Sequence, residues 1–153
     1  MQHLKRHHRG QLAAILGADV TATGRAGQGD FVRSLGARTF TQDAGEVRDG
    51  FDVVVDTVGG PALEASYGLT RRGGRLVALS APPSAQRAEQ LDIHAMFFVV
   101  TPDAAQLSRL AGFADSGKLR PVVSQVFPLR QGREAFESGT RPHPPGKTVL
   151  LVR

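Results

Sequence analysis

Polar and glycine residues follow an apolar run in the middle of the chain, GFDVVVDTVGG at positions 50–60. Asp56 and Thr57 end the run, a Val-Gly-Gly turn follows, and a helix is expected to begin at Pro61. In α/β proteins, ligands bind where the carboxyl ends of parallel strands meet such turns. The pattern is therefore typical of a ligand site, although the same order of strand, turn and helix also occurs in any α/β domain.

The elements that would position these residues follow from apolar periodicity. Residues 52–56 are expected to form a strand covered on both faces, because three consecutive β-branched valines suit a pleated backbone and the run does not alternate with polar residues. Further strands are expected at 18–23, 38–41, 75–79, 95–100 and 146–152, and helices at 11–16, 30–35, 61–69, 103–116 and 131–138. This alternation predicts an α/β fold with a mainly parallel sheet and helices on both faces.

The charge of the chain limits its partners. The 153 residues include 19 basic and 14 acidic side chains, a formal net charge of +5, and arginine outnumbers lysine. Beyond the first ten positions the basic residues are scattered and have no interleaved aromatic side chains for base stacking, so nucleic-acid binding is disfavoured. Phosphate groups on a small cofactor are an equally good use for a few of the arginines.

The chain contains no cysteine, which excludes disulfides, thiolate chemistry and cysteine-based zinc sites. His3 and His7 could share a helical face and hold a metal, but no acidic or cysteine partner is nearby, and we interpret residues 1–10 as a solvated basic tail. No apolar segment approaches the ~20 residues that span a bilayer, and the N-terminus lacks the apolar core of a secretion signal. We therefore expect a cytoplasmic protein with no zinc and no membrane partner.

Six motifs in order carry a family resemblance: LGADVTATGR, FVRSLGA, DVVVDTVGG, RRGGRLVALSAPP, the FFVV strand and the terminal GKTVLLV. Over residues 11–153 the chain resembles the medium-chain dehydrogenase/reductase superfamily. Its quinone oxidoreductase-like branch, often labelled zinc-binding dehydrogenases, is the most similar. The resemblance implies a Rossmann domain that binds NAD(P)H and, in relatives, a GroES-like catalytic domain before it.

The resemblance also implies how the chain is divided. Residues 11–118 correspond to part of the Rossmann domain, and residues 119–153 to the extension that in relatives packs on the GroES-like domain. Residues 1–10 show neither the first Rossmann strand nor its glycine-rich phosphate loop, so we expect a truncated Rossmann fold. The apolar face of the last strand, with Val149, Leu151 and perhaps Leu150, is then expected to be available for self-association.

The first strand normally lies at the centre of such a sheet, between the strands expected here at 18–23 and 52–56. Without it, these two strands either pair directly or leave backbone groups that another segment or chain must satisfy. We expect direct pairing or a homodimer, with reduced stability.

The resemblance implies NADP(H) as the cofactor. Strand 18–23 is followed by Gly24 and Arg25, and a carboxylate that would bind the ribose of NAD is absent there because Asp19 lies at the opposite end. Arg25 is the implied partner of the 2′-phosphate, and a solvent-facing loop arginine is the alternative. Gln42 and Asp43 stand where many relatives have an Asp-Tyr pair beside the cofactor, a departure that weakens the adenosine site.

Other implied cofactor contacts follow later strands. Val58, Gly59, Ser80 and Ala81 match positions that line the ribose and nicotinamide side, and Phe98 and Val99 match the strand that borders the nicotinamide. For the apolar residues among these, core packing is the alternative. No nucleophile and no acid/base pair stands out, so the catalytic residues are unknown and the protein chiefly binds and orients the cofactor.

Two functions remain open from the sequence. The first is the nucleotide-binding portion of an NADPH-dependent quinone or enone oxidoreductase, inactive alone and completed by a GroES-like domain in trans. The second is a non-catalytic truncated remnant or interaction module of the same family. The acceptor substrate cannot be identified, because substrate contacts in this family come largely from the GroES-like domain.

Overall fold

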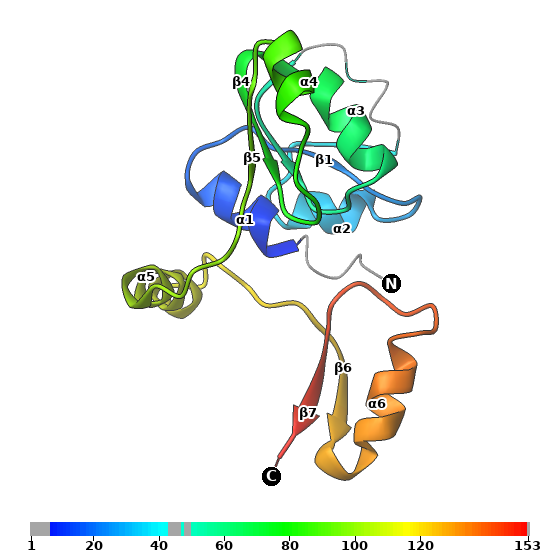
Figure 1. Ribbon diagram of the computed structural model, residues 1–153. Helices are drawn as coiled ribbons and strands as arrows, with labels where there is room; N and C mark the ends of the chain where they lie inside the picture. The colour runs from blue at the N-terminus through cyan, green and yellow to red at the C-terminus, as the bar shows by residue number, and fades with distance from the viewer. Residues whose placement is uncertain (1–6, 43–46, 48–49, 153) are drawn as a thin grey trace. The chain divides into compact units, whose positions relative to one another are not determined.

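The computed structural model describes residues 7–42, 47 and 50–152, and these divide into two compact units (Figure 1). Of the described residues, unit 1 contains those up to Val20, Phe31–Arg38 and those from Asp103 onward. Unit 2 contains those of Thr21–Asp30 and Thr39–Pro102. Each unit has its own parallel strands and helices.

The largest sheet belongs to unit 2 and has three parallel strands in the order β3 (Phe51–Asp56), β4 (Thr70–Ala78) and β5 (His94–Phe97). Val54 of β3 is level with Leu76 of β4. Strand β3 lies where the valine run predicts a strand, but the expected burial on both faces is wrong, because Val53 and Val55 are 51% and 47% exposed. The carboxyl ends of the three strands lie at one edge, as in any parallel sheet.

Two helices cover one face of this sheet (Figure 1): α3 (Pro61–Leu69) and α4 (Ala85–Gln90). Proline at the first position of α3 begins that helix, as its sequence predicts, because proline has no backbone N–H and its φ suits the first turn. The core of unit 2 lies between these helices and the sheet; its buried members are Leu63, Tyr67, Leu76, Ala78, Ala88 and Ile93. Tyr67 also accepts a hydrogen bond from the Ser84 backbone N–H, 2.6 Å away, which joins α3 to the start of α4.

The turn expected at residues 71–74 is present, but it lies inside β4 as an irregularity of the ladder. Phe51 pairs with Thr70 and Val53 with Arg75, so β4 contains more residues than β3 over this stretch. Gly73 has φ of 69°, a left-handed conformation that glycine adopts without a Cβ penalty. Pairing with β3 therefore extends β4 back to the end of α3. The glycine turn signal depends only on neighbouring residues and could not reveal this extension.

A second sheet of unit 2 has two parallel strands, β1 (Thr21–Thr23) and β2 (Thr39–Thr41), joined by a connection that contains α2 (Gly29–Ser34). The expected direct pairing of the strand before Gly24 with β3 is wrong, because β1 and β3 belong to separate sheets. A three-residue strand makes few backbone hydrogen bonds, each contributing about 0.5–1.5 kcal/mol. These bonds offset little of the conformational entropy that is lost when the surrounding chain becomes ordered. Pairing of these strands with a second chain stays a prediction.

Unit 1 contains two helices of nine and twelve residues, α1 (His7–Ile15) and α5 (Ala104–Asp115). Helix α1 begins four residues before the expected start, and α5 matches its prediction because the Asp103 carboxylate caps it by accepting from the Gln106 N–H at 2.9 Å. The side-chain amide of Gln11 makes two hydrogen bonds to the backbone of Arg120, as a donor at 3.0 Å and an acceptor at 2.9 Å. These bonds connect α1 to the chain that follows α5.

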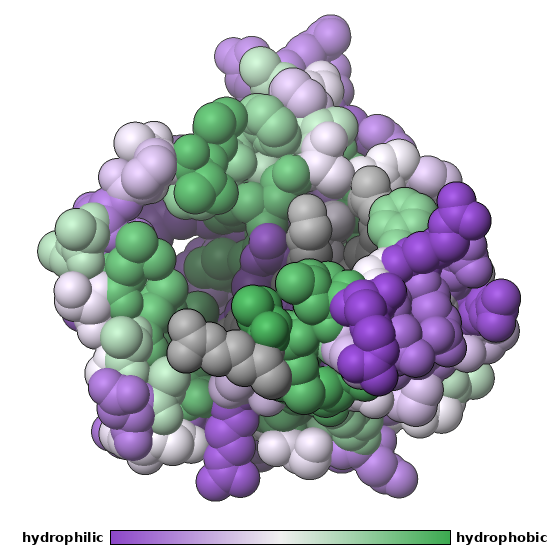
Figure 2. Space-filling model, turned by 90° about the horizontal axis from the view of Figure 1, so that it is seen from below, coloured by the Kyte–Doolittle hydropathy of each residue, from purple (hydrophilic) through white to green (hydrophobic). Residues whose placement is uncertain are grey.

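Unit 1 also contains the Phe31–Arg38 segment and a two-stranded parallel sheet of β6 (Val123–Pro128) and β7 (Lys147–Leu151), with a 3-10 helix η3 (Leu129–Gln131) and α6 (Gly132–Ser138) between the two strands. Large hydrophobic residues remain exposed on these elements, including Val126, Phe136 and Leu151. Seen from below the view of Figure 1, hydrophobic residues form several green areas at the surface (Figure 2).

The chain is therefore an α/β protein with parallel strands, and the expected Rossmann-like fold class is confirmed. None of the helices in the described ranges has the length and apolar character needed to cross a membrane.

Candidate functional site

A cluster of four hydrogen-bonded residues lies at the carboxyl ends of β3 and β4, and we call Asp56, Val58, Gly59 and Ser80 the strand-end cluster. The Asp56 side chain, in a residue only 3% exposed, accepts from the backbone N–H groups of Val58 and Gly59 at 3.3 and 2.8 Å. It also accepts from the Ser80 hydroxyl at 3.3 Å. Aspartate at a strand end commonly bonds to backbone N–H groups two or three residues ahead, so the Asp-Thr-Val-Gly order itself favours this turn.

Gly59 and Gly60 follow in the left-handed region, with φ of 79° and 56°. At Gly59 the space is also restricted, because an added Cβ would lie 2.8 Å from the Ser80 Oγ and 4.0 Å from the Ala81 Cβ. The structure thus brings four of the predicted site residues together: Val58, Gly59, Ser80 and Ala81. They lie together at the edge where parallel sheets bind ligands, with Val58 and Ser80 exposed and Gly59 buried.

A second group of predicted residues lies in the loop after β1. The Gly24 N–H donates to the Thr41 carbonyl at 3.3 Å, and an added Cβ on Gly24 would lie 2.9 Å from the ring of Phe40. Arg25 is exposed, and its backbone N–H donates to the Gln28 side-chain oxygen at 3.3 Å. The Gln28 N–H in turn donates to the Arg25 carbonyl at 3.3 Å. Gln28 therefore fixes the loop that presents the Arg25 guanidinium to solvent.

Asp19 lies at the opposite end of β1 from Arg25, as the sequence predicts. Asp19 precedes β1 and forms an exposed ion pair with Arg38, 2.7 Å away. Gln42 is exposed, whereas Asp43 lies outside the described residues. Arg25 is consequently the charged side chain that follows β1 directly.

The remaining predicted residues, Phe98 and Val99, lie beyond the end of β5. The Phe98 N–H donates to the Ala78 carbonyl at 2.9 Å, which continues the β4 pairing by one residue. Phe98 is 50% exposed and Val99 69% exposed. The strand expected through residue 100 therefore ends at Phe97, because no further partner in the described chain extends the ladder.

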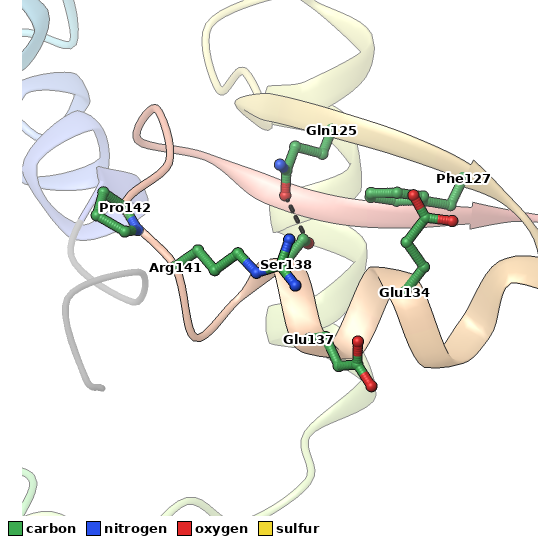
Figure 3. Close-up of a pocket in the computed structure, with 7 residues that line it drawn as sticks. All are labelled: Gln125, Phe127, Glu134, Glu137, Ser138, Arg141 and Pro142. Carbon is green, nitrogen blue, oxygen red and sulfur yellow. Dashed lines mark hydrogen bonds between the residues drawn. The ribbon is translucent and has the colours of Figure 1, made fainter.

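A separate cavity of about 260 Å³ lies in unit 1, between β6, α6 and the loop before β7 (Figure 3). Its lining residues are Gln125, Phe127, Glu134, Glu137, Ser138, Arg141 and Pro142. The Ser138 hydroxyl donates to the Gln125 side-chain oxygen at 2.9 Å, and the two glutamates are exposed. No predicted site residue belongs to this cavity, and its side chains do not form an arrangement of nucleophile and base. The strand-end cluster remains the better candidate site.

Residues 16–150 match a family described as zinc-binding dehydrogenase. The chain belongs to this family. The match confirms the resemblance to the quinone oxidoreductase-like medium-chain dehydrogenases/reductases.

Three relatives illustrate the family. The "Probable zinc-binding oxidoreductase, mitochondrial" of Arthroderma benhamiae is 31% identical, covering 93% of this chain and 47% of that protein. The "NADPH-dependent alkenal/one oxidoreductase, chloroplastic" of Arabidopsis thaliana is also 31% identical, covering 86% of this chain and 33% of that protein. The quinone oxidoreductase from Coxiella burnetii is similar in structure, with a TM-score of 0.82 and 26% identity, covering 96% of this chain and 49% of that one. The chain thus spans about half the length, or less, of these family members.

The name of the family raises the question of zinc. In the described part of the chain, no three His, Cys, Asp or Glu side chains gather where they could hold a metal ion. The residues do not fit a zinc site of the usual three or four protein ligands, so no chemistry is assigned to zinc.

The sequence indicated Asp56 only as a polar residue at a strand end, not as the acceptor that holds Val58, Gly59 and Ser80, and it did not indicate Gln28 as the support of the Arg25 loop. The signal for Asp56 was its position two and three residues before the N–H groups that it binds. Gln28 gave no comparable local signal, because a glutamine in a loop has no strong conformational preference of its own.

Proposed function

We propose that the chain is the nucleotide-binding portion of an NADPH-dependent oxidoreductase that reduces quinones or enones. The observation that carries this proposal is the strand-end cluster in a member of the zinc-binding dehydrogenase family. A glycine turn and a hydroxyl, held together at the carboxyl ends of two adjacent parallel strands, are the features with which such sheets approach a nucleotide. The names of the alkenal/one and quinone oxidoreductases support the acceptor class.

The side chains present fit a phosphorylated dinucleotide. Arg25 would bind the 2′-phosphate, since guanidinium groups form charge-assisted hydrogen bonds to phosphate oxygens and its loop is held by Gln28. The turn at Val58 and Gly59 would face the ribose and nicotinamide side, with Ser80 beside it. The Ser80 hydroxyl donates to Asp56, so its oxygen lone pairs remain able to accept from a ligand.

The apolar residues would exclude water from the same side. Ala81 lies next to the glycine turn, and Phe98 and Val99 continue from β5 with exposed side chains that could cover a nicotinamide. When bound, the nicotinamide supplies the hydride, while this chain binds and orients it. Turnover would require a GroES-like domain to supply the substrate contacts.

The test is a titration of the purified chain with NADPH, followed by nucleotide fluorescence, and with 2′,5′-ADP, which carries the adenosine half alone. Arg25→Ala should weaken binding of 2′,5′-ADP about tenfold, the effect of losing ~1.4 kcal/mol of phosphate contact. Arg75→Ala is the matched control, because Arg75 is an exposed arginine of unit 2 within β4, level with Val53 and His94. It should leave both affinities unchanged.

Failure of the unaltered chain to bind NADPH at millimolar concentration would refute the cofactor proposal. Binding without reduction of a quinone would agree with a nucleotide-binding portion that lacks its partner domain. Quinone turnover by the chain alone would exclude the non-catalytic alternative.

A further inference from the structure

A buried carboxylate at the end of β3 has no part in the predicted cofactor contacts. Asp56 nevertheless bonds to three of the residues that make them: Val58, Gly59 and Ser80. We infer that Asp56 is a positioning residue that fixes the nicotinamide side of the nucleotide site, and that the adenosine side does not depend on it. This inference rests on the proposed function and names a residue on which that function depends.

The donor set explains why a carboxylate is needed. One Asp56 oxygen, Oδ1, accepts from the Val58 N–H, and Oδ2 accepts from both the Gly59 N–H and the Ser80 hydroxyl. A carboxylate accepts through both oxygens, whereas asparagine accepts through one and donates through its amide nitrogen. Asparagine of the same shape therefore leaves at least one of the two N–H groups facing another donor.

The positions of the bonds show what the carboxylate fixes. The strands themselves are already joined at this point, since the Leu79 N–H donates to the Asp56 backbone carbonyl at 3.0 Å. The side chain acts beyond the ladder, on the turn after β3 and on the hydroxyl after β4. The Gly59 and Gly60 carbonyls accept from N–H groups of α3, and the Val58 and Gly59 N–H groups donate to Asp56, so the turn is held from both sides.

Close packing makes the turn sensitive to this support. An atom added at the Cα of Gly59 would lie 2.8 Å from the Ser80 Oγ, so the turn and the hydroxyl already touch. If the carboxylate no longer holds both, the turn and Ser80 separate and the surface facing the nicotinamide changes shape. The Arg25 loop is held by other bonds, to Gln28 and Thr41, and should not respond.

The experiment compares Asp56→Asn with the unaltered chain in binding NADPH and 2′,5′-ADP. The affinity for NADPH should fall about tenfold or more, as expected for a lost charge-assisted hydrogen bond, while the affinity for 2′,5′-ADP stays the same. Asp52→Asn is the matched control: Asp52 lies on the same strand, is exposed and pairs with Arg71, and its change should alter neither affinity. Equal losses for both ligands, or no loss for NADPH, would overturn the inference.

Hydrogen exchange at the Gly59 amide provides a second measurement that needs no ligand. Protection should fall in Asp56→Asn and remain in Asp52→Asn; unchanged protection in Asp56→Asn would overturn the inference. If Asp56→Asn does not fold, Ser80→Ala replaces it and should reduce Gly59 protection and NADPH affinity but not 2′,5′-ADP affinity. If the unaltered chain binds no nucleotide, the proposed function fails, and the exchange data still decide whether Asp56 holds the turn.

Discussion

Replacing Leu76 by alanine should destabilise unit 2 strongly. Leu76 is 0% exposed, lies in the middle strand of the β3-β4-β5 sheet, and is level with Val54 and Ala95 on either side. Removal of a fully buried leucine side chain costs 2–5 kcal/mol from lost burial and the cavity left behind, so we expect about 3 kcal/mol. The free energy of unfolding of a domain is typically about 5–15 kcal/mol, so the variant should still fold at low temperature.

Urea unfolding followed by tyrosine fluorescence measures this loss. Tyr67 is the one tyrosine in a chain without tryptophan, and it is buried in the same core as Leu76. With a slope of about 2 kcal/mol per molar urea, a loss of 3 kcal/mol lowers the midpoint by about 1.5 M. Leu107→Ala is the control, since Leu107 in α5 is 62% exposed and should shift the midpoint little.

The reasoning would be refuted if Leu76→Ala shifted the midpoint no more than Leu107→Ala does. A changed slope of unfolding free energy against urea in Leu76→Ala would instead show that the compactness of the denatured or native state had changed. The two variants would then be compared by their thermal unfolding midpoints, followed by circular dichroism.

Two further predictions test the site turn and a helix cap. Gly60→Ala should lower the free energy of unfolding by about 1–2 kcal/mol, because alanine is strained at the positive φ of both turn glycines. Gly59→Ala should lower it by about 1 kcal/mol more, because the added Cβ also meets the Ser80 hydroxyl. Equal urea midpoints for the two variants would contradict this. Hydrogen bonding from the Gln106 backbone N–H lowers the pKa of Asp103 below its ordinary value of 3.8, so the capping carboxylate stabilises α5 above that pH and loses this effect as the pH falls below it. Asp103→Ala should therefore show less helical circular dichroism than the unaltered chain at pH 7 and the same signal near pH 2, and a difference that persisted at pH 2 would count against the cap.

Local signals predicted those elements whose ends are set by their own residues. The valine run gave β3, proline at position 61 gave the start of α3, and the Asp103 cap gave the start of α5. Properties that depend on distant partners were not predictable. The apolar segment after Phe97 was expected to continue a strand, but apolar character alone does not supply the neighbouring strand that a ladder needs.

The candidate site shows the same division. Val58, Gly59 and Ser80 were predicted from their positions after strands, and parallel pairing of β3 with β4 brings them together. The bond from Ser80 to Asp56 depends on the register of the two strands, which the sequence does not state, whereas the bonds from Val58 and Gly59 are local to the turn. The independence of the β1-β2 sheet was missed for a similar reason, since strand order within a family does not fix which edges pair in a given chain.

The bonds between Gln11 and Arg120 have a consequence for the order of folding. They join positions 109 residues apart, whereas the main sheet of unit 2 is built from the single stretch between Phe51 and Phe97. Closing a loop loses chain entropy that grows with the logarithm of its length, so shorter closures within unit 2 should come first. During synthesis, α1 leaves the ribosome early but cannot make these bonds until most of the chain has followed; protection of unit 1 amides before those of β3 and β4 in pulse-labelled hydrogen exchange would contradict this order.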